Sequence, residues 1–200
     1  YRNTLINDNL ALVDKAIEEK QDLIILPETA FPTILNTDKN LLEYLKRKSQ
    51  FIDIITGSLY QKENLYHNST YHFSKGESNI AHKVVLVPFG EAVPLPEKIK
   101  NFINDMFYDG AQDYTKAESP TDFTIKGIKF RNAICYEATT DDIFENIGNT
   151  KYMIATSNNA WFTPSTEPTL QRLLMKYYAK KYNVIVYNSA NGSENSIIYP

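Results

Sequence analysis

Three residues whose side chains can do nucleophilic chemistry lie beside apolar runs in this sequence. Glu28 comes just after the first run, Lys83 sits within a second, and Cys135 ends a third. A cysteine nucleophile needs a base to take its proton and a cation to stabilise the negative charge that develops. Glu28 and Lys83 supply those two groups, so the three residues together predict an acyl-transfer site. Taken singly, each has a structural alternative: a buried thiol for Cys135, and a paired or solvated charge for the others.

The order of these residues resembles that of the carbon-nitrogen hydrolase (nitrilase) superfamily. This resemblance implies an α/β fold, the nitrilase-like αββα sandwich, in which two sheets pack face to face between outer layers of helices. It also implies a Glu-Lys-Cys catalytic triad, and the matching positions are Glu28, Lys83 and Cys135. The expected mechanism passes through an acyl group held on the cysteine as a thioester.

Longer stretches of sequence resemble one branch of this superfamily, the apolipoprotein N-acyltransferases. The matching blocks follow the order typical of the branch and are Pro27–Pro32, Lys83–Pro94, Ile134–Glu137 and Ser157–Phe162. Enzymes of the branch move an acyl chain from a phospholipid to the N-terminal cysteine amine of a diacylglyceryl-modified apolipoprotein. The resemblance therefore implies those two substrates and a membrane surface as partners, with no cofactor. It places the catalytic domain on the periplasmic side of the bacterial inner membrane.

Further residues of the same blocks are candidates for supporting roles. By resemblance, Glu91 matches a carboxylate near the active centre, where it positions Lys83 or assists proton transfer. The backbone N–H of Tyr136, directly after the nucleophile, can donate to an oxyanion. Glu137 supports the site or caps the following helix. Trp161 and Phe162 either contact lipid at the mouth of the site or pack in the core.

The chain also departs from the pattern of the branch. Asn159 stands where Asp is usual, and the pair Gln171-Arg172 stands where a Gln-His pair is usual. A membrane domain and a first β-strand, which precede this region in the family, are not found ahead of it here. We therefore expect residues 1–200 to form one nitrilase-like catalytic domain, truncated at both ends, with an unpaired sheet edge near Leu23–Leu26.

Periodicity and turn signals predict alternating helices and strands that could hold these residues. The chain is expected to contain helices at 3–20, 39–48, 141–147 and 168–182, single strands at 23–26, 52–58, 152–156 and 184–188, and hairpins at 68–73 with 79–85 and 122–125 with 128–134. Between the hairpins, residues 88–121 read as a long loop that includes a short helix at 99–107.

The composition excludes several classes of protein. With 42% hydrophobic and 22% charged residues, the chain is typical of a globular protein. One cysteine cannot form an intrachain disulfide, and a net charge of -3 with scattered basic residues argues against nucleic acid as a partner. No apolar run is long enough to span a bilayer. His67, His72 and His82 lack the spacing of zinc ligands, so no metal is expected.

Two other functions are compatible with the same residues. A soluble nitrilase-type amidase would use the triad to hydrolyse a small amide, with water as the acceptor. A non-catalytic α/β module would require Glu28, Lys83 and Cys135 to lie far apart in space. The blocks Pro88–Pro94 and Asn159–Phe162 favour the acyltransferase over the amidase.

Overall fold

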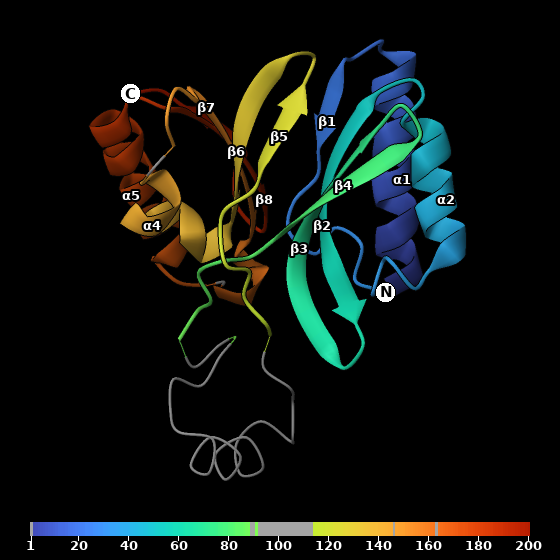
Figure 1. Ribbon diagram of the computed structural model, residues 1–200, viewed down its shortest axis with the longest axis horizontal. Helices are drawn as coiled ribbons and strands as arrows, with labels where there is room; N and C mark the ends of the chain where they lie inside the picture. Colours follow the sequence, from blue (N-terminus) through green and yellow to red (C-terminus); the bar gives the residue numbers. More distant parts are fainter. Residues whose placement is uncertain (1, 89–90, 92–113, 146, 163) are drawn as a thin grey trace, which may run out of the picture.

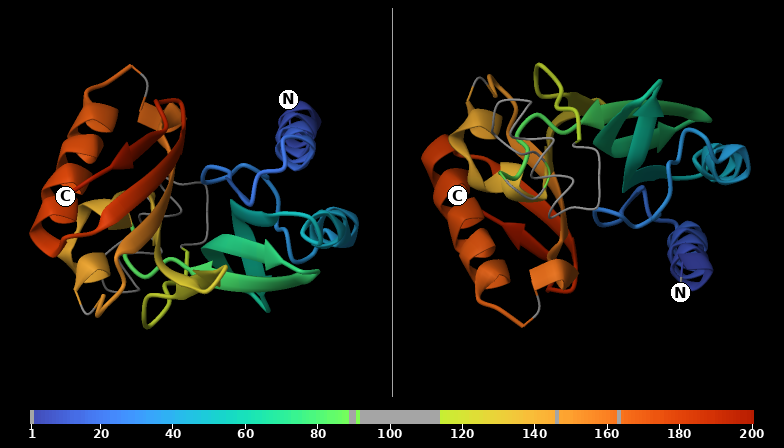
Figure 2. Two further views of the ribbon diagram at one scale, coloured as in Figure 1. Left: turned by 90° about the horizontal axis from the view of Figure 1, so that it is seen from above. Right: turned by 90° about the horizontal axis from the view of Figure 1, so that it is seen from below.

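Two β-sheets pack face to face, with helices on the outer side of each (Figure 1). The computed structural model describes residues 2–88, 91, 114–145, 147–162 and 164–200. The views along the other axis show the same layers, with the two groups of helices at opposite edges of the molecule (Figure 2). This is the αββα sandwich expected from the sequence.

The first sheet is built from the N-terminal part of the chain. Its strand order is β1-β2-β3-β4, in which β1 and β2 are parallel and the other pairs are antiparallel. The elements are α1 (Arg2–Glu18), β1 (Leu23–Ile25), α2 (Lys39–Lys48), β2 (Asp53–Lys62), β3 (Leu65–Ser74) and β4 (Glu77–His82). Among the strands of the described residues, β1 pairs with β2 alone, so its other side is a sheet edge there, as the sequence predicts.

The second sheet follows in the C-terminal part. Its strand order is β5-β6-β7-β8-β9, with a parallel centre formed by β6, β7 and β8. The elements are β5 (Asp122–Ile125), β6 (Ile128–Ile134), the short 3-10 helix η1 (Cys135–Thr139), α4 (Asp141–Phe144), β7 (Tyr152–Asn158), the 3-10 helix η2 (Asn159–Phe162), α5 (Glu167–Tyr182), β8 (Ile185–Asn191) and β9 (Ser196–Ile198).

Local signals explain where the helices begin and end. The Asp38 side chain accepts a hydrogen bond from the Leu41 backbone N–H and so caps α2. Helix α5 has Pro168 in its first turn, and Asn183 ends it in the left-handed conformation. Within the described parts of the chain, no helix has the length and apolarity that crossing a membrane requires.

Apolar side chains fill all three interfaces between the layers. Val13, Leu45 and Tyr71 belong to the cluster between the outer helices and the first sheet. A second cluster, which includes Met153 and Met175, lies between the second sheet and its helices. A third cluster between the sheets includes Ile55, Ala81, Phe123, Phe130 and Ile154. Because the sheets share this last cluster, residues at their ends are held in fixed relative positions.

The structure differs from the sequence prediction at the first hairpins. Strand β2 continues to Lys62 and forms a long hairpin with β3 that we did not predict, because its turn at Glu63 contains neither glycine nor proline. Strand β4 ends at His82, so Lys83 begins the following loop instead of lying inside a strand. The short helix expected at 99–107 lies outside the described residues.

Gly57 connects the fold to the site because β2 passes very close to the segment that carries Glu28. A Cβ atom at Gly57 would lie 2.6 Å from the Glu28 Cα and 2.9 Å from the Thr29 backbone nitrogen. Both are main-chain atoms that cannot rotate away. Gly57 also donates its own backbone N–H to the Pro27 carbonyl, at 3.2 Å.

We predict that Gly57→Ala lowers the free energy of unfolding by about 1–3 kcal/mol, because the added methyl overpacks the contact between β2 and the Glu28 segment. Urea unfolding measures this loss. Asn79→Ala, at an exposed position of β4, is the matched control and should change stability by less than about 0.5 kcal/mol. Equal stability of the two variants would contradict the close approach.

Candidate active site

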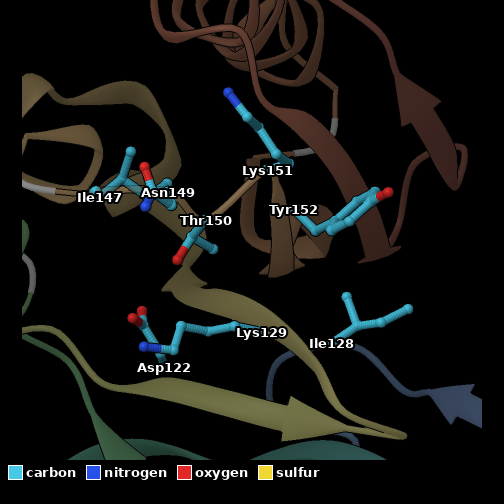
Figure 3. Close-up of a pocket in the computed structure, with 9 residues that line it drawn as sticks. Asp122, Ile128, Lys129, Ile147, Asn149, Thr150, Lys151 and Tyr152 are labelled. Atoms are coloured by element: carbon cyan, nitrogen blue, oxygen red, sulfur yellow. The ribbon is translucent and has the colours of Figure 1, made fainter.

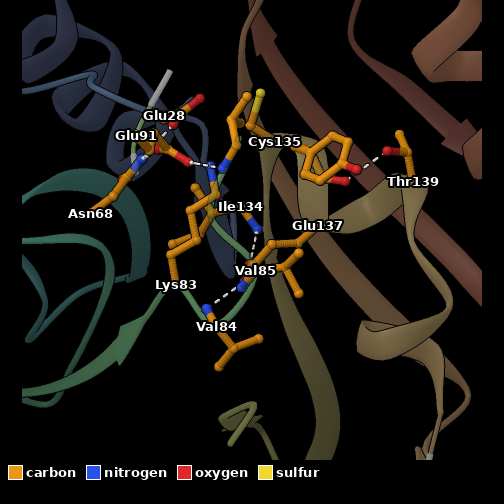
Figure 4. Close-up of polar contacts among 12 residues, drawn as sticks. Glu28, Asn68, Lys83, Val84, Val85, Glu91, Ile134, Cys135, Glu137 and Thr139 are labelled. Carbon is orange, nitrogen blue, oxygen red and sulfur yellow. Dashed lines mark hydrogen bonds and ion pairs between the residues drawn. The ribbon is translucent and has the colours of Figure 1, made fainter. Parts of the chain in front are cut away.

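The side chains of Glu28, Lys83 and Cys135 line one pocket of about 550 Å³ where the two sheets meet. Glu28 follows β1, Lys83 follows β4, and Cys135 follows β6. Figure 4 shows the Cys135 sulfur and the two charged side chains pointing toward one region. The sequence placed Glu28 and Cys135 at strand ends and Lys83 within a strand, and tertiary packing brings the three residues from both sheets together.

The Lys83 ammonium is held between acidic groups. Its Nζ lies 2.7 Å from Glu91 Oε2. The Asn68 side-chain amide donates to Glu28 Oε1 at 2.7 Å and to Glu91 Oε1 at 2.9 Å, so one amide links the two carboxylates. The Val87 backbone N–H donates to Glu91 Oε2 at 2.9 Å. Lys83, Asn68 and the two glutamates therefore form one connected polar network.

Lys83 remains a cation although its side chain is only 1% exposed. Burial by itself would lower its pKa, but the nearby charges of Glu28 and Glu91 outweigh burial and leave the pKa above its usual value. A permanently charged ammonium at the pocket wall can stabilise an anion that forms beside it.

Cys135 combines a strained backbone with a buried thiol. Its φ is +53°, a left-handed conformation at the junction of β6 and η1. Burial and the charge of Glu28 raise the pKa of the thiol to about 12, although Lys83 acts in the opposite direction. Because burial raises the thiol pKa more than Lys83 lowers it, the thiol is neutral at neutral pH.

Glu137 joins the loop that carries Lys83 to the strand that carries Cys135. Its Oε1 accepts from the Val84 and Val85 backbone N–H groups at 2.5 and 2.9 Å, and its Oε2 accepts from the Ile134 N–H at 2.7 Å. Its side chain is almost completely buried, and burial raises its pKa to about 7 against these hydrogen bonds. Glu137 accepts from the Ile134 backbone N–H at the start of η1 and ties two site segments together, whereas the following helix, α4, has Thr140 at its N-cap position.

The remaining candidates lie at or near the pocket. Glu91 and Phe162 line it, and Phe162 is 43% exposed. Tyr136 follows Cys135 in η1 and is exposed. Trp161 lies in η2, but its side chain is outside the described part of the structure. Sequence analysis missed Asn68, because no local pattern reveals its pairing with two distant carboxylates.

Other polar clusters lack this chemistry. A pocket of about 500 Å³ at the opposite end of the second sheet, lined by residues including Asp122, Lys129 and Lys151, contains no nucleophile paired with a base (Figure 3). His67 and His82 stack at 4.4 Å, and His72 bonds to Asp53. Among the described residues, no three His, Cys, Asp or Glu side chains are grouped to hold a metal ion.

Comparison with known proteins identifies relatives over the whole chain. This chain is 49% identical over 200 residues to an apolipoprotein N-acyltransferase of Wolinella succinogenes. The aligned region covers 100% of this chain and 48% of that protein. Identity to the apolipoprotein N-acyltransferase of Helicobacter pylori is 43%, covering 100% of this chain and 47% of the relative. The chain thus spans about half the length of the curated relatives it matches. No protein-family model matches it.

Solved structures show the same fold at much lower sequence identity. A carbon-nitrogen hydrolase superfamily protein from Xanthomonas campestris has a TM-score of 0.72 at 15% identity, covering 98% of this chain and 74% of the other. A carbon-nitrogen hydrolase from Helicobacter pylori has a TM-score of 0.70 at 13% identity, covering 100% of this chain and 75% of the other. The nitrilase-type sandwich expected from the sequence is therefore confirmed.

We predict that Glu137→Gln lowers the free energy of unfolding by about 1–3 kcal/mol, because an amide NH₂ replaces one acceptor oxygen and leaves a buried backbone N–H unpaired. Denaturant unfolding of the variant and the parent protein measures the difference. Glu145→Gln, an exposed glutamate after α4, is the matched control and should be neutral. A neutral Glu137→Gln would contradict the bridging role.

We also predict that the Cys135 thiol reacts with iodoacetamide at a rate that rises tenfold for each pH unit between about pH 7 and about pH 9. The thiol pKa lies above this window, so the thiolate fraction grows throughout it, whereas a free cysteine with a pKa of about 8.5 levels off. Lys83→Met should slow the reaction at every pH, because Lys83 lowers the thiol pKa. A plateau near pH 8 in the folded parent protein would contradict the buried thiol.

Proposed function

We propose that this chain is the catalytic domain of an apolipoprotein N-acyltransferase. All of the chain is similar to about half the length of such enzymes, and it has the carbon-nitrogen hydrolase fold. It would transfer an acyl chain from a phospholipid to the N-terminal amine of a lipid-modified apolipoprotein. Residues 1–200 would form the catalytic domain, with Glu28, Lys83 and Cys135 as the triad.

In the first half-reaction, Cys135 attacks the ester carbonyl of a phospholipid. Glu28 takes the thiol proton as the sulfur–carbon bond forms, which the high pKa of the thiol makes necessary. Lys83 and the Tyr136 backbone N–H stabilise the negative oxygen of the tetrahedral intermediate. The carbon–oxygen bond to the leaving group then breaks, and Glu28 returns the proton to that oxygen, which releases a lysophospholipid and leaves a thioester on Cys135.

In the second half-reaction, the acceptor amine attacks the thioester carbonyl. Glu28 accepts a proton from the amine nitrogen, the carbon–sulfur bond breaks, and the proton passes to the departing sulfur to restore the thiol. The products are an amide and the free enzyme. Because the acyl group moves to the enzyme before the acceptor is needed, the reaction has a ping-pong order.

The main support for these roles is that one pocket holds a nucleophile, a buried cation and a carboxylate, each delivered by a different strand end. Glu91 acts as a positioning residue, since it contacts the Lys83 ammonium and is itself held by Asn68 and the Val87 N–H. An isolated buried ammonium would be costly, and this network fixes its place beside the pocket.

The acyl donor would reach the pocket through its apolar part. Pro32, Leu59, Val87 and Phe162 line the pocket together with the polar residues, and Phe162 is the exposed aromatic among them. An apolar wall that leads to a nucleophile suits an acyl chain better than a small amide. We place this domain at the periplasmic face of the bacterial inner membrane, where both substrates would be available.

We predict that phospholipid without acceptor leaves an acyl group on Cys135 in the protein as its gene encodes it. Intact-protein mass spectrometry should show the added mass, and hydroxylamine should remove it, as expected for a thioester. Cys135→Ala should abolish the adduct, because it removes the proposed nucleophile and residues 1–200 contain no other cysteine. Lys83→Ala should reduce its rate of formation by about 100- to 1,000-fold, by removing the charge that stabilises the oxyanion.

The same experiment separates the acyltransferase from an amidase. Incubation with a small amide and water should give no turnover that depends on Cys135. If phospholipid never modifies Cys135 while a small amide is hydrolysed through it, the protein is a nitrilase-type amidase and the proposal is overturned.

A further inference from the structure

We propose that Gln171 is a further catalytic residue, which donates a hydrogen bond to the nucleophilic sulfur, and that Asn159 fixes the direction of this bond. Gln171 Nε2 lies 3.6 Å from Cys135 Sγ in donor geometry. The residue belongs to α5 and approaches the sulfur from outside the Glu28, Asn68, Lys83 and Glu91 network described above. The catalytic role rests on the proposed function, whereas the contact itself can be tested independently of acyl transfer.

The burial of Gln171 indicates a specific role. The side chain is only 3% exposed and shares the inward face of α5 with Met175 and Ala179, both of which are completely buried. A primary amide on such a face is costly unless its polar atoms are bonded. Here both ends are bonded: the NH₂ contacts the sulfur and the carbonyl oxygen contacts Asn159. An apolar residue would fill the same space without these contacts.

Asn159 determines which end of the Gln171 amide faces the sulfur. Its Nδ2 donates to Gln171 Oε1 at 3.0 Å and to Ser193 Oγ at 2.9 Å, so both amide hydrogens are directed at acceptors. Asn159 is 1% exposed and lies at the start of η2, directly after β7. With the Gln171 oxygen accepting this bond, its NH₂ group faces Cys135.

A donor at this position is useful because the sulfur changes charge during the reaction. The thiol is neutral at rest, but the sulfur is negative as it attacks and again as the thioester breaks. A hydrogen bond to an anionic acceptor is about twice as strong as one to a neutral group, so the Gln171 NH₂ stabilises the charged form more. Besides burial, the charges of Glu28 and Glu167 raise the pKa of the Cys135 thiol, whereas the charge of Lys83 and a hydrogen bond from the Asn158 backbone lower it. Gln171 adds a donor whose strength does not depend on pH.

An aspartate at position 159 would reverse this arrangement. Its carboxylate can only accept hydrogen bonds, so it would attract the Gln171 NH₂ and turn the amide oxygen toward the sulfur. The oxygen would accept from the thiol and oppose the thiolate. Asn159 is therefore the residue that makes Gln171 a donor in this protein.

The test is the rate at which iodoacetamide modifies Cys135, measured at about pH 8 by mass spectrometry of the peptide that contains it, in the protein as its gene encodes it. Gln171→Glu keeps the side-chain shape and the hydrogen bond from Asn159 but replaces the NH₂ donor with an oxygen. Gln171→Met removes both the NH₂ donor and the acceptor of the Asn159 hydrogen bond. Losing a hydrogen bond to a charged group raises a pKa by about one to two units. Each variant should therefore react about 10- to 100-fold more slowly.

Gln21→Met, at an exposed position, is the control for the change of residue type and should react at the parent rate. Thermal unfolding of each variant shows that it is folded. A purely structural role for Gln171 would lower the unfolding temperature and leave the alkylation rate of the folded protein unchanged. Rates within about twofold of the parent in both Gln171→Glu and Gln171→Met would overturn the proposal.

Asn159→Asp tests the direction of the amide. It should slow alkylation to about the rate of Gln171→Glu, because both variants present an oxygen to the sulfur. If Asn159→Asp reacts at the parent rate while the Gln171 variants are slow, the orienting role of Asn159 is wrong.

Alkylation does not require phospholipid, so the same measurements separate this contact from the proposed function. If the Gln171 variants are alkylated slowly but the parent protein transfers no acyl group, the proposed function is refuted and the contact stands. If the Gln171 variants are alkylated at the parent rate while the parent protein transfers the acyl group, only the contact is refuted.

Discussion

The buried ammonium of Lys83 is the constraint on which the rest of the site depends. A cation that is 1% exposed is tolerated only when opposite charges lie close to it, and Glu91 at 2.7 Å provides the first of these. Glu91 is in turn held by Asn68 and by the Val87 N–H, and Asn68 also holds Glu28. Compensating one buried charge therefore fixes the positions of two carboxylates around the pocket.

The same burial shapes the chemistry of Cys135. A low-dielectric pocket makes the ammonium and each hydrogen bond stronger, but it also raises the thiol pKa to about 12. In the proposed mechanism, the proton would therefore be removed only when an acyl carbonyl is present to receive the sulfur. A neutral buried thiol also reacts slowly with other electrophiles.

Both sheets must be packed correctly for these groups to meet. Glu28 and Lys83 come from the first sheet and Cys135 from the second, so the apolar cluster between the sheets sets the distances across the pocket. Glu137 adds a polar link across the same boundary, since one carboxylate binds the loop after β4 and the end of β6. Gly57 allows β2 to approach the Glu28 segment closely enough for this assembly.

The sequence by itself determined the order of the helices and strands and the strand ends at which Glu28 and Cys135 lie. These features depend on local apolar periodicity and on turn residues such as Gly127, which are readable along the chain. The resemblance of its sequence blocks to a known family indicated the sandwich and its triad before any coordinates. The β2–β3 hairpin was not predicted, because its turn contains neither glycine nor proline.

Only the tertiary structure decided the links between residues far apart in the chain. Asn68 between two carboxylates, Glu137 across two segments, and the Asn159-Gln171 pair beside the sulfur are each made by side chains whose partners lie on other elements. The neutral state of the Cys135 thiol was likewise not readable from the sequence. It results from a balance between burial and neighbouring charges, and both exist only after the chain has folded.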